Sequence, residues 1–171
     1  MKLPMKAQRL FITELDESMA ESVHRNSLDV NNRRFVPDEV FETVDAAQEM
    51  IARLIKFYTQ DDSPLVYAIR LNDGQYIGHI QAVPIENGWE IGYHIGEAYT
   101  GNGYAAEAVG TFLAPVMERL GISRIAGVCR ADNAASRRVL EKCGFVLEFL
   151  GERDYHGGRH EICRYSYKGL G

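Results

Sequence analysis

The sequence predicts a single α+β domain over residues 1–171, with a mixed and mostly antiparallel β-sheet flanked by helices. Two observations predict this class. In the first half, three short apolar runs are separated by Gly-containing turns, which is typical of an antiparallel meander. In the second half, apolar residues recur at helical spacing and strands alternate with helices. Neither an internal repeat nor a low-complexity linker divides the chain, so we expect one domain.

The first predicted elements are a strand and two helices. Residues Arg9 to Leu15 alternate weakly between apolar and polar side chains and predict a strand, after which Asp16 can cap a short helix to about His24. A polar loop rich in Asn and Asp follows. A longer helix is predicted over Phe41 to Tyr58, with a candidate cap at Asp45, because apolar residues recur there at helical spacing. These residues are Val44, Ala47, Ile51, Leu54, Ile55 and Tyr58.

The antiparallel meander comes next. Its strands are predicted at Leu65 to Leu71, Tyr76 to Val83 and Trp89 to Ile95. The turns between them read Asn72-Asp73-Gly74 and Glu86-Asn87-Gly88. Asp-Gly and Asn-Gly pairs between apolar runs predict type I′ hairpin turns, in which both central residues have positive φ.

The second half begins with a Gly-rich stretch, Thr100 to Gly103, followed by a helix predicted over Ala105 to Leu120. Gly121 occupies the position of a C-terminal cap. One helix face is expected to be buried, with Ala108, Val109, Phe112, Leu113, Val116 and Leu120. The remaining predicted elements are a strand at Arg124 to Cys129, a helix capped by Asn133 that reaches Cys143 and stops at Gly144, and strands at Phe145 to Gly151 and His160 to Tyr167 joined by a Gly-Gly loop.

Composition narrows the functional classes. Apolar residues make up 46% and charged residues 25% of the chain, as in ordinary globular proteins. The formal net charge is −5, and the sequence lacks a dense cluster of Lys and Arg, which argues against a nucleic-acid partner. No apolar run has the length of a membrane span or a signal peptide, so we expect no membrane insertion. Three cysteines without CxxC spacing fit a reducing, cytoplasmic location.

The segment from Trp89 to Ala108 carries the clearest functional signal, because a strand, a loop with two glycines and a helix start follow one another there. At such a helix start, free N–H groups converge on one point and favour an anion. Glycines let the backbone come close to a diphosphate, and Ala105 and Ala106 keep the first helical turn thin. A surface loop whose glycines only satisfy turn geometry is the plain alternative.

A dinucleotide-binding site is a second alternative, because Gly101 to Ala106 formally match G-x-G-x-x-A. In that fingerprint the first glycine directly follows an apolar first strand, whereas here Gly96 to Thr100 intervene. A ribose-binding acid should follow about 20 residues later, and Asp132 comes too late. This context disfavours a nicotinamide or flavin site.

Three motifs, taken in order, connect the chain with a known family. E-I-G-Y-H-I precedes the loop, T-G-N-G-Y-A forms it, and C-R-A-D-N-A-A-S-R-R-V-L-E-K-C-G-F follows it. This run resembles the GNAT superfamily of N-acetyltransferases, specifically the RimJ/RimL-like branch, and the likeness covers nearly the whole chain. The resemblance implies a GNAT-like domain with a splayed sheet, acetyl-CoA as acetyl donor, no metal, and direct transfer to a primary amine.

The resemblance also implies the cofactor contacts. The family's diphosphate loop falls on Thr100 to Ala105, and Thr100 departs from the usual Gln or Arg, so we expect one weaker contact there. The pantetheine arm is expected along the backbone of the preceding strand end. Asn133 is a further implied contact that can also serve as a helix cap. The implied cofactor residues are Tyr93, His94, Ile95, Thr100, Gly101, Asn102, Gly103, Tyr104, Ala105, Ala106 and Asn133.

Two catalytic residues follow from the same resemblance. A primary amine must lose a proton before or during attack, and Glu90 lies on the strand where many relatives carry their base. An outward-facing strand carboxylate is the alternative for Glu90. Many relatives have a Tyr acid at the position of Leu140, so the resemblance implies Ser136 as the proton donor to the thiolate. Simple packing in the first turn of its helix is the alternative for Ser136.

The resemblance leaves the acceptor open between a protein N-terminal α-amine and a small amine. Tyr155 is expected to line the acceptor pocket from the loop between the last two strands. The net charge of −5 favours a basic acceptor. We expect His94 to be a wall residue of the cleft and not a base, and Cys143 to belong to the core.

A second functional class is retained. The departures at Thr100 and Leu140 also fit a catalytically silent domain that binds acyl-CoA as a sensor or an interaction module. A homodimer is a candidate assembly that no sequence feature decides.

Overall fold

The computed structural model describes residues 1–60 and 62–169. Within these residues the strands form one eight-stranded sheet in the order β1-β2-β3-β4-β5-β6-β8-β7. Its neighbouring strands pair antiparallel, apart from the parallel pair β5 and β6. This confirms the mixed, mostly antiparallel sheet predicted from the sequence. It also differs from the parallel, doubly wound sheet that a dinucleotide fingerprint requires.

Most predicted elements are present with similar bounds, whereas β1, α2 and η2 were not predicted. The strands are β1 (Met5–Lys6), β2 (Leu10–Glu14), β3 (Leu65–Leu71), β4 (Tyr76–Ile85), β5 (Gly88–Ile95), β6 (Arg124–Arg130), β7 (Val146–Tyr155) and β8 (Gly158–Lys168). The α-helices are α1 (Ala20–Ser27), α2 (Val30–Phe35), α3 (Val44–Phe57), α4 (Tyr104–Leu120) and α5 (Ala134–Lys142). Short 3-10 helices occur at η1 (Glu17–Met19), η2 (Pro37–Glu39) and η3 (Glu97–Tyr99).

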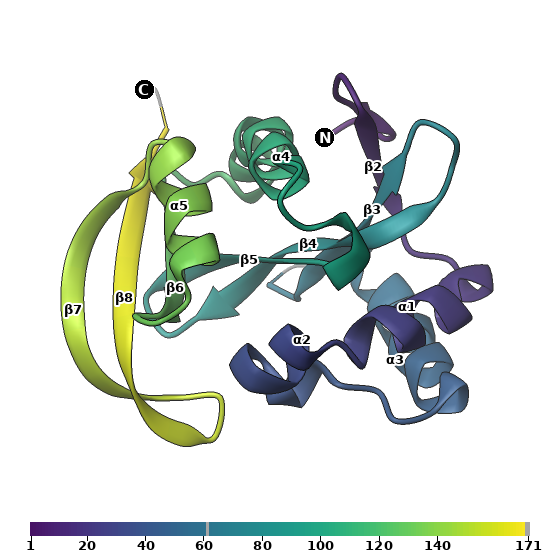
Figure 1. The fold of residues 1–171 in the computed structure, drawn as a ribbon. Coiled ribbons are helices and arrows are strands. Elements are labelled where there is room, and N and C mark those ends of the chain that lie inside the picture. The colour runs from purple at the N-terminus through teal and green to yellow at the C-terminus, as the bar shows by residue number, and fades with distance from the viewer. Residues whose placement is uncertain (61, 170–171) are drawn as a thin grey trace.

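Helices cover both faces of the sheet (Figure 1). The pair α4 and α5 lies on one side, and α1, α2 and α3 lie on the other. None of the helices in the described part of the chain has the length and apolarity needed to cross a lipid bilayer.

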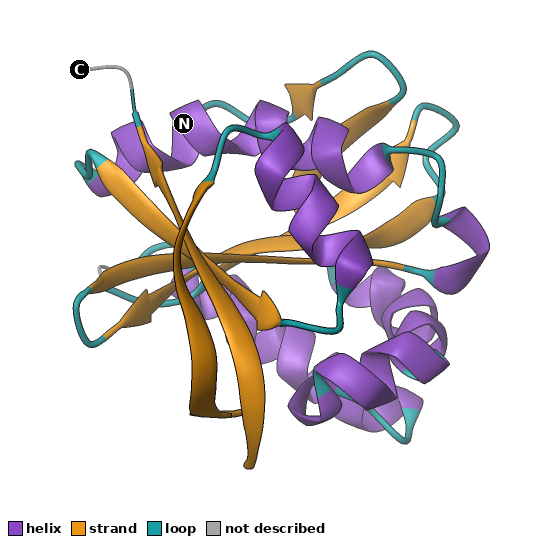
Figure 2. Cartoon of the chain, turned by 60° about the vertical axis from the view of Figure 1, so that its left-hand side comes forward, coloured by secondary structure: helices purple, strands orange, loops and turns teal. Residues whose placement is uncertain are grey.

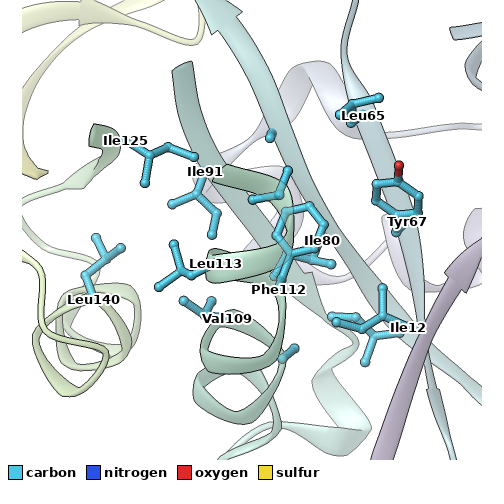
Figure 3. Close-up of a cluster of buried hydrophobic side chains, with 14 of the residues drawn as sticks. Ile12, Leu65, Tyr67, Ile80, Ile91, Val109, Phe112, Leu113, Ile125 and Leu140 are labelled. Atoms are coloured by element: carbon cyan, nitrogen blue, oxygen red, sulfur yellow. The ribbon is translucent and has the colours of Figure 1, made fainter. Parts of the chain in front are cut away.

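The main core lies between α4 and the sheet. Val109, Phe112 and Leu113 project from α4 toward Ile80 and Ile91 of the central strands (Figure 3). Phe112 and Ile80 are completely buried. Burying a side chain of this size stabilises the fold by about 1.5–3 kcal/mol, so this packing fixes α4 and the loop at its start. The predicted buried face of the helix is confirmed, except that Met117 is buried and Leu120 is partly exposed.

The two hairpin turns of the meander form where predicted, but they are not type I′ turns. Among their residues only Gly74 and Gly88 have positive φ, at 92° and 120°. In the first turn, the N–H of Gly74 donates to the carbonyl of Leu71 at 2.8 Å, and the N–H of Leu71 donates to the carbonyl of Gln75 at 2.9 Å. This is the three-residue pattern in which a left-handed glycine follows a tight turn. Glycine therefore absorbs the unusual φ, and the preceding Asn and Asp do not need it.

Helix starts show where short-range signals compete. Asp16 caps the first helical turn as predicted, because its carboxylate accepts from the N–H of Ser18 at 2.9 Å. The cap of α3 is Thr43 and not Asp45, since Thr43 Oγ1 accepts from the N–H of Ala46 at 3.1 Å. A hydroxyl one residue before the first helical residue has the geometry for capping, whereas Asp45 is already in the first turn.

The first long polar segment is not a loop throughout, because it contains α2 and η2. Asn32 is buried at 2% exposure, and its Nδ2 donates to the carbonyls of Ser27 at 3.0 Å and Glu39 at 3.1 Å. These bonds tie the short helix to the segments on either side. At the other end of the chain, β7 extends to Tyr155 and β8 begins at Gly158, so the last hairpin is longer than predicted.

Candidate functional site

The sheet opens between β5 and β6. β5 pairs with β4 along its whole length, but its described pairs with β6 are Glu90 with Ala126 and Ile91 with Gly127. Residues 92–95 therefore have no partner strand on the β6 side within the described chain. An unpaired strand edge offers backbone N–H and C=O groups that can bond the amides of an extended ligand. This confirms the splayed sheet that the resemblance implies.

The Gly-rich loop leads directly into α4. Gly101 and Gly103 have positive φ of 78° and 80°, which glycine adopts without steric cost. α4 has no side-chain cap, and its first backbone bond runs from the N–H of Glu107 to the carbonyl of Gly103 at 3.1 Å. No described residue accepts a hydrogen bond from the N–H groups of residues 101–106. These free donors and the positive end of the helix dipole make an anion site.

Arg9 holds this loop from outside the cleft, a role that sequence analysis did not detect. Its backbone N–H and Nε donate to the two carboxylate oxygens of Glu107, both at 2.7 Å. Its Nη1 donates to the carbonyl of Asn102 at 2.9 Å, and its guanidinium lies 4.8 Å from the centre of the Tyr104 ring. One arginine thus contacts the loop and the first turn of α4 together, which restricts their relative motion.

A cleft of about 820 Å³ runs from this loop along the opening of the sheet. Its walls come from both helical layers, from β4, β5 and β6, and from the tip of the β7–β8 hairpin. The long hairpin reaches past the sheet toward the helices of the opposite layer (Figure 2). There His156 Nδ1 lies 2.5 Å from Asp38 Oδ1, so the hairpin tip and η2 close one end of the cleft.

Almost all site residues predicted from the sequence line this one cleft. Asn102 is the exception within the described chain: its side-chain amide donates to the carbonyls of Tyr99 and Thr100, both at 3.1 Å, and braces the loop. The Thr100 hydroxyl also turns to the protein, since it donates to the carbonyl of Glu97 at 2.9 Å. The cleft-lining set comprises Glu90, Tyr93, His94, Ile95, Thr100, Gly101, Gly103, Tyr104, Ala105, Ala106, Asn133, Ser136 and Tyr155.

Glu90 is in the short part of β5 that still pairs with β6, just before the two strands separate. Burial raises the pKa of its carboxyl to about 7, although the positive charge of Arg164 acts in the opposite direction. A carboxyl with a pKa near neutrality exchanges its proton readily at physiological pH. Glu90 lines the cleft and is only partly exposed, which favours the proposed role over that of an outward-facing strand carboxylate.

Ser136 lies in the first turn of α5 and faces β5. Asn133 caps this helix, because its Oδ1 accepts from the N–H of Ser136 at 3.1 Å. The Ser136 hydroxyl lies 3.0 Å from the hydroxyl of Tyr93, which also donates to the Ser136 carbonyl at 3.1 Å. Burial raises the pKa of Tyr93 well above its usual value, so Tyr93 keeps its proton. The Tyr93 side chain was missed from the sequence, where only its backbone was considered.

His94 and Cys129 of the cleft wall, and Cys143 outside it, behave as structural groups. Burial, followed by the nearby His79, lowers the pKa of His94 to about 4, and its Nε2 lies 3.2 Å from the Asn26 carbonyl. Burial raises the pKa of Cys129 to about 11, which leaves a poor nucleophile. Cys143 donates to the Ala106 carbonyl at 3.4 Å and joins α5 to α4.

Tyr155 ends strand β7, and so it does not lie in a loop as predicted. It lines the cleft, and its hydroxyl donates to the carbonyl of Val128 at 3.2 Å. Two further lining residues that sequence analysis missed are Arg138 and Lys142, which add positive charge on the α5 side of the cleft. Arg130 of β6 also lines the cleft, but its guanidinium pairs with Asp132. This positive charge could be recognised only in the folded structure, because the residues do not form a cluster in the sequence.

Comparisons with known proteins agree with this geometry. Residues 9–146 match the family model described as the acetyltransferase (GNAT) domain. YnaD of Bacillus subtilis, called an uncharacterized N-acetyltransferase, is 27% identical over 143 residues, which cover 82% of this chain and 81% of that protein.

Solved structures show the same fold. A GNAT-family acetyltransferase from Bacillus anthracis aligns with a TM-score of 0.83 at 24% identity, over 96% of this chain and 97% of that one. RimL, the ribosomal L7/L12 α-N-protein acetyltransferase, was solved in complex with coenzyme A. It aligns with a TM-score of 0.82 at 22% identity, again over 96% and 97% of the two chains.

Proposed function

The chain belongs to the GNAT acetyltransferase family, and from that premise we propose that its cleft transfers the acetyl group of acetyl-CoA directly to a primary amine. It is an acetyl-CoA-dependent acetyltransferase. The observation that carries the proposal is the set of free N–H groups at residues 101–106, located beside the unpaired edge of residues 92–95. The first suits a diphosphate and the second suits the amide-containing arm attached to it.

The proposed binding site of acetyl-CoA uses both features. The diphosphate bonds the amides of Gly101 to Ala106, and the arm follows the backbone of Tyr93, His94 and Ile95. Arg138 and Lys142 lie on the α5 side of the cleft, where they attract the phosphate groups. Asn133 is proposed as a further contact in addition to its role as the α5 cap.

In the proposed reaction, the nitrogen lone pair of the amine attacks the thioester carbonyl carbon. The carbonyl oxygen gains negative charge, which an N–H of the opened β5 edge can stabilise. The C–S bond then breaks, and the thiolate leaves with the electron pair. Glu90 takes the proton that the amine loses, either directly or through water, because its carboxyl lies in the same cleft with a pKa of about 7.

Ser136 is the proposed proton donor to the departing thiolate. Its hydroxyl lies 3.0 Å from that of Tyr93, so the two form a hydrogen-bonded pair at the cleft wall. Because burial keeps the proton on Tyr93, its hydroxyl positions that of Ser136 while the Ser136 proton moves to sulfur, and the Ser136 oxygen then takes a proton from water. A coenzyme A thiolate resembles that of cysteine in basicity, and a weak acid therefore suffices.

The acceptor and the branch within the family are part of the proposal. The sequence motifs and the fold shared with RimL support a RimJ/RimL-like enzyme that acts on a protein N-terminal α-amine or on a small amine. The three cysteines are free thiols, which supports a cytoplasmic location. A homodimer stays a prediction.

Thiol release tests the proposal. Acetyl-CoA is mixed with a panel of primary amines, and coenzyme A production is followed in parallel with coenzyme A binding by calorimetry. We expect amine-dependent thiol release, with acetylated product formed in equal amount. Binding without turnover across the panel would instead favour the silent sensor. If NADH raises the melting temperature of the protein and acetyl-CoA does not, that result contradicts the assignment of acetyl-CoA as the cofactor.

A further inference from the structure

Glu90 faces the helical layer formed by α1, α2 and α3. Side chains alternate between the two faces of a strand, and its neighbour Ile91 belongs to the core under α4 (Figure 3). Glu90 therefore points to the opposite face of the sheet. Val83 of β4 is paired with Glu90, so its side chain lies on the same face, with the two Cβ atoms about 4.5–5.5 Å apart. Apolar surface thus begins directly beside the proposed base.

Further apolar side chains continue this surface around the same part of the cleft. They come from α1, α2, α3, β4 and the segment after η2, and each is only half-buried: Val23, Phe35, Met50, Leu54, Val83 and Phe41. We call this part of the cleft the apolar pocket. Half-buried apolar side chains that converge on one cavity are the usual lining of a small-molecule site, in which a few polar groups fix the orientation of the ligand.

The charged side chains that line this side of the cleft already have partners within the protein. Gln81 Nε2 donates to Glu39 Oε1 at 2.9 Å, and His79 Nε2 lies 3.2 Å from Glu39 Oε2. Asp38 Oδ1 lies 2.5 Å from His156 Nδ1. The net charge of the whole chain favours a basic acceptor, but these local pairs compensate the two carboxylates. Apart from the proposed base, the described residues of this side therefore offer no unpaired charge to a second charged group on the acceptor.

We propose that the acceptor is a primary amine that carries an uncharged apolar group the size of an aromatic ring, with the amine at Glu90 and the apolar group in the apolar pocket. This inference rests on the acetyl transfer proposed above and names its substrate class. Because Val83 lies beside Glu90, a short alkyl linker brings the ring from the amine to the apolar wall. Phe35 and Phe41 supply aromatic partners for the ring. A free arylalkylamine and the first residue of a peptide share this chemistry.

Four amines test the inference. Phenethylamine carries the ring, and ethylamine lacks it. 4-(2-Aminoethyl)benzoate adds a carboxylate to the same ring, and 4-(2-aminoethyl)benzamidine adds a cation. We expect kcat/KM for phenethylamine to exceed that for ethylamine by at least about tenfold, because an apolar pocket discriminates at that level for a single methylene group. Both charged amines should be slower than phenethylamine by at least about tenfold, since their charge loses water without gaining a partner.

A substitution in the apolar pocket locates the ring. Val83→Thr keeps the shape of the side chain and adds a hydroxyl beside Glu90, so the ratio of kcat/KM for phenethylamine to that for ethylamine should fall at least about threefold. Val146→Thr makes the same change at a 67% exposed valine of β7, outside the cleft, and should keep the wild-type ratio. The comparison of the four amines on the wild-type protein decides the question even where a variant fails to fold.

Two short peptides distinguish the two sources of the amine. They differ only in their first residue, which is Phe in one and Ser in the other. We expect kcat/KM to be higher for the peptide that begins with Phe. If phenethylamine outperforms both peptides, the apolar group belongs to a free amine. If the peptide that begins with Phe is the best substrate, the apolar group belongs to a peptide N-terminus.

Several results would overturn the inference. Equal kcat/KM for phenethylamine and ethylamine shows that no apolar group is recognised. A charged amine that outperforms phenethylamine, or a peptide with Ser that outperforms the one with Phe, has the same meaning. If no amine is acetylated, the transfer reaction itself fails. Calorimetry of the coenzyme A complex with phenethylamine and with ethylamine then still decides whether the ring is bound, since equal affinities contradict it.

Discussion

The assignment of Glu90 as proton acceptor makes a quantitative prediction about pH. Replacing it with Gln keeps the shape of the side chain and removes its titration. With a pKa of about 7, Glu90 is ionised to about 9% at pH 6 and about 91% at pH 8 in the free enzyme. Only the ionised carboxylate accepts a proton, so the contribution of Glu90 to kcat/KM should grow about tenfold between these pH values.

The assay measures kcat/KM from pH 5.5 to 9 for wild type and for Glu90→Gln with the same amine. The amine also titrates, but its ionisation affects both proteins equally and cancels in their ratio. We expect this ratio to rise about tenfold from pH 6 to pH 8, to level off above that, and to reach about 100 or more at the plateau. Amides of similar shape do not titrate here, so the variant alone should lack the step.

A ratio that stays near one over this range would refute the role of Glu90. A large ratio that is already at its plateau at pH 5.5 would show that burial does not raise the pKa of Glu90. Glu86→Gln, which lies in an exposed turn, serves as the matched control and should follow the wild-type profile.

The other predictions concern the loop, the acid and the sheet. Arg9→Met removes the contacts to the cofactor loop, so the Kd of coenzyme A in calorimetry should rise about tenfold. The Kd of pantetheine, which lacks the diphosphate, should stay within about twofold. Equal losses of affinity for both ligands would contradict the positioning role of Arg9. Ser136→Ala should lower kcat between about tenfold and 100-fold, and Tyr93→Phe should have a smaller effect in the same direction. Single-turnover rates that match wild type would contradict proton donation from Ser136 to the thiolate. Gly78→Ala places a Cβ 2.0 Å from the carbonyl oxygen of His94 and should lower the free energy of unfolding, measured in urea, by roughly 3 kcal/mol or more. An unchanged urea midpoint of unfolding would contradict the close contact between β4 and β5 at Gly78.

Much of the fold could be predicted because its signals are local. Strand β3 and the turn glycines Gly74 and Gly88 follow directly from a short continuous apolar run and from turn chemistry. The exact turn type could not be predicted, because Asn-Gly and Asp-Gly also fit turns in which glycine alone has positive φ. The cap at Thr43 was missed for a similar reason, since Asp45 is an equally good capping residue on local grounds.

Helix α2 was missed because its stability comes from tertiary contacts. Its sequence, V-N-N-R-R-F, contains two asparagines and has no helical apolar periodicity, so local propensity favours a loop. Burial of Asn32 and its bonds to Ser27 and Glu39 hold the helix in place. Such bonds join residues whose proximity the sequence does not reveal.

The candidate site shows the same division. The cofactor loop at Gly101 and Gly103 could be predicted, because glycines before a helix start have a direct physical meaning. Arg9 could not, since it lies 98 residues from Glu107 in the sequence. Glu39 was hidden in a polar segment after Pro37, and only its contacts with His79 and Gln81 across the cleft reveal it as part of the site.

The central claim is that the backbone amides at the start of α4 bind the diphosphate of the acetyl donor. The most direct measurement is a titration of isotope-labelled protein with coenzyme A and, separately, with pantetheine, followed by backbone amide NMR. With coenzyme A we expect the largest shifts at residues 101–106, because these N–H groups gain charged acceptors, and with pantetheine we expect them to stay nearly unmoved while residues 92–95 respond. Coenzyme A binding that leaves the amides of residues 101–106 unshifted would contradict the account.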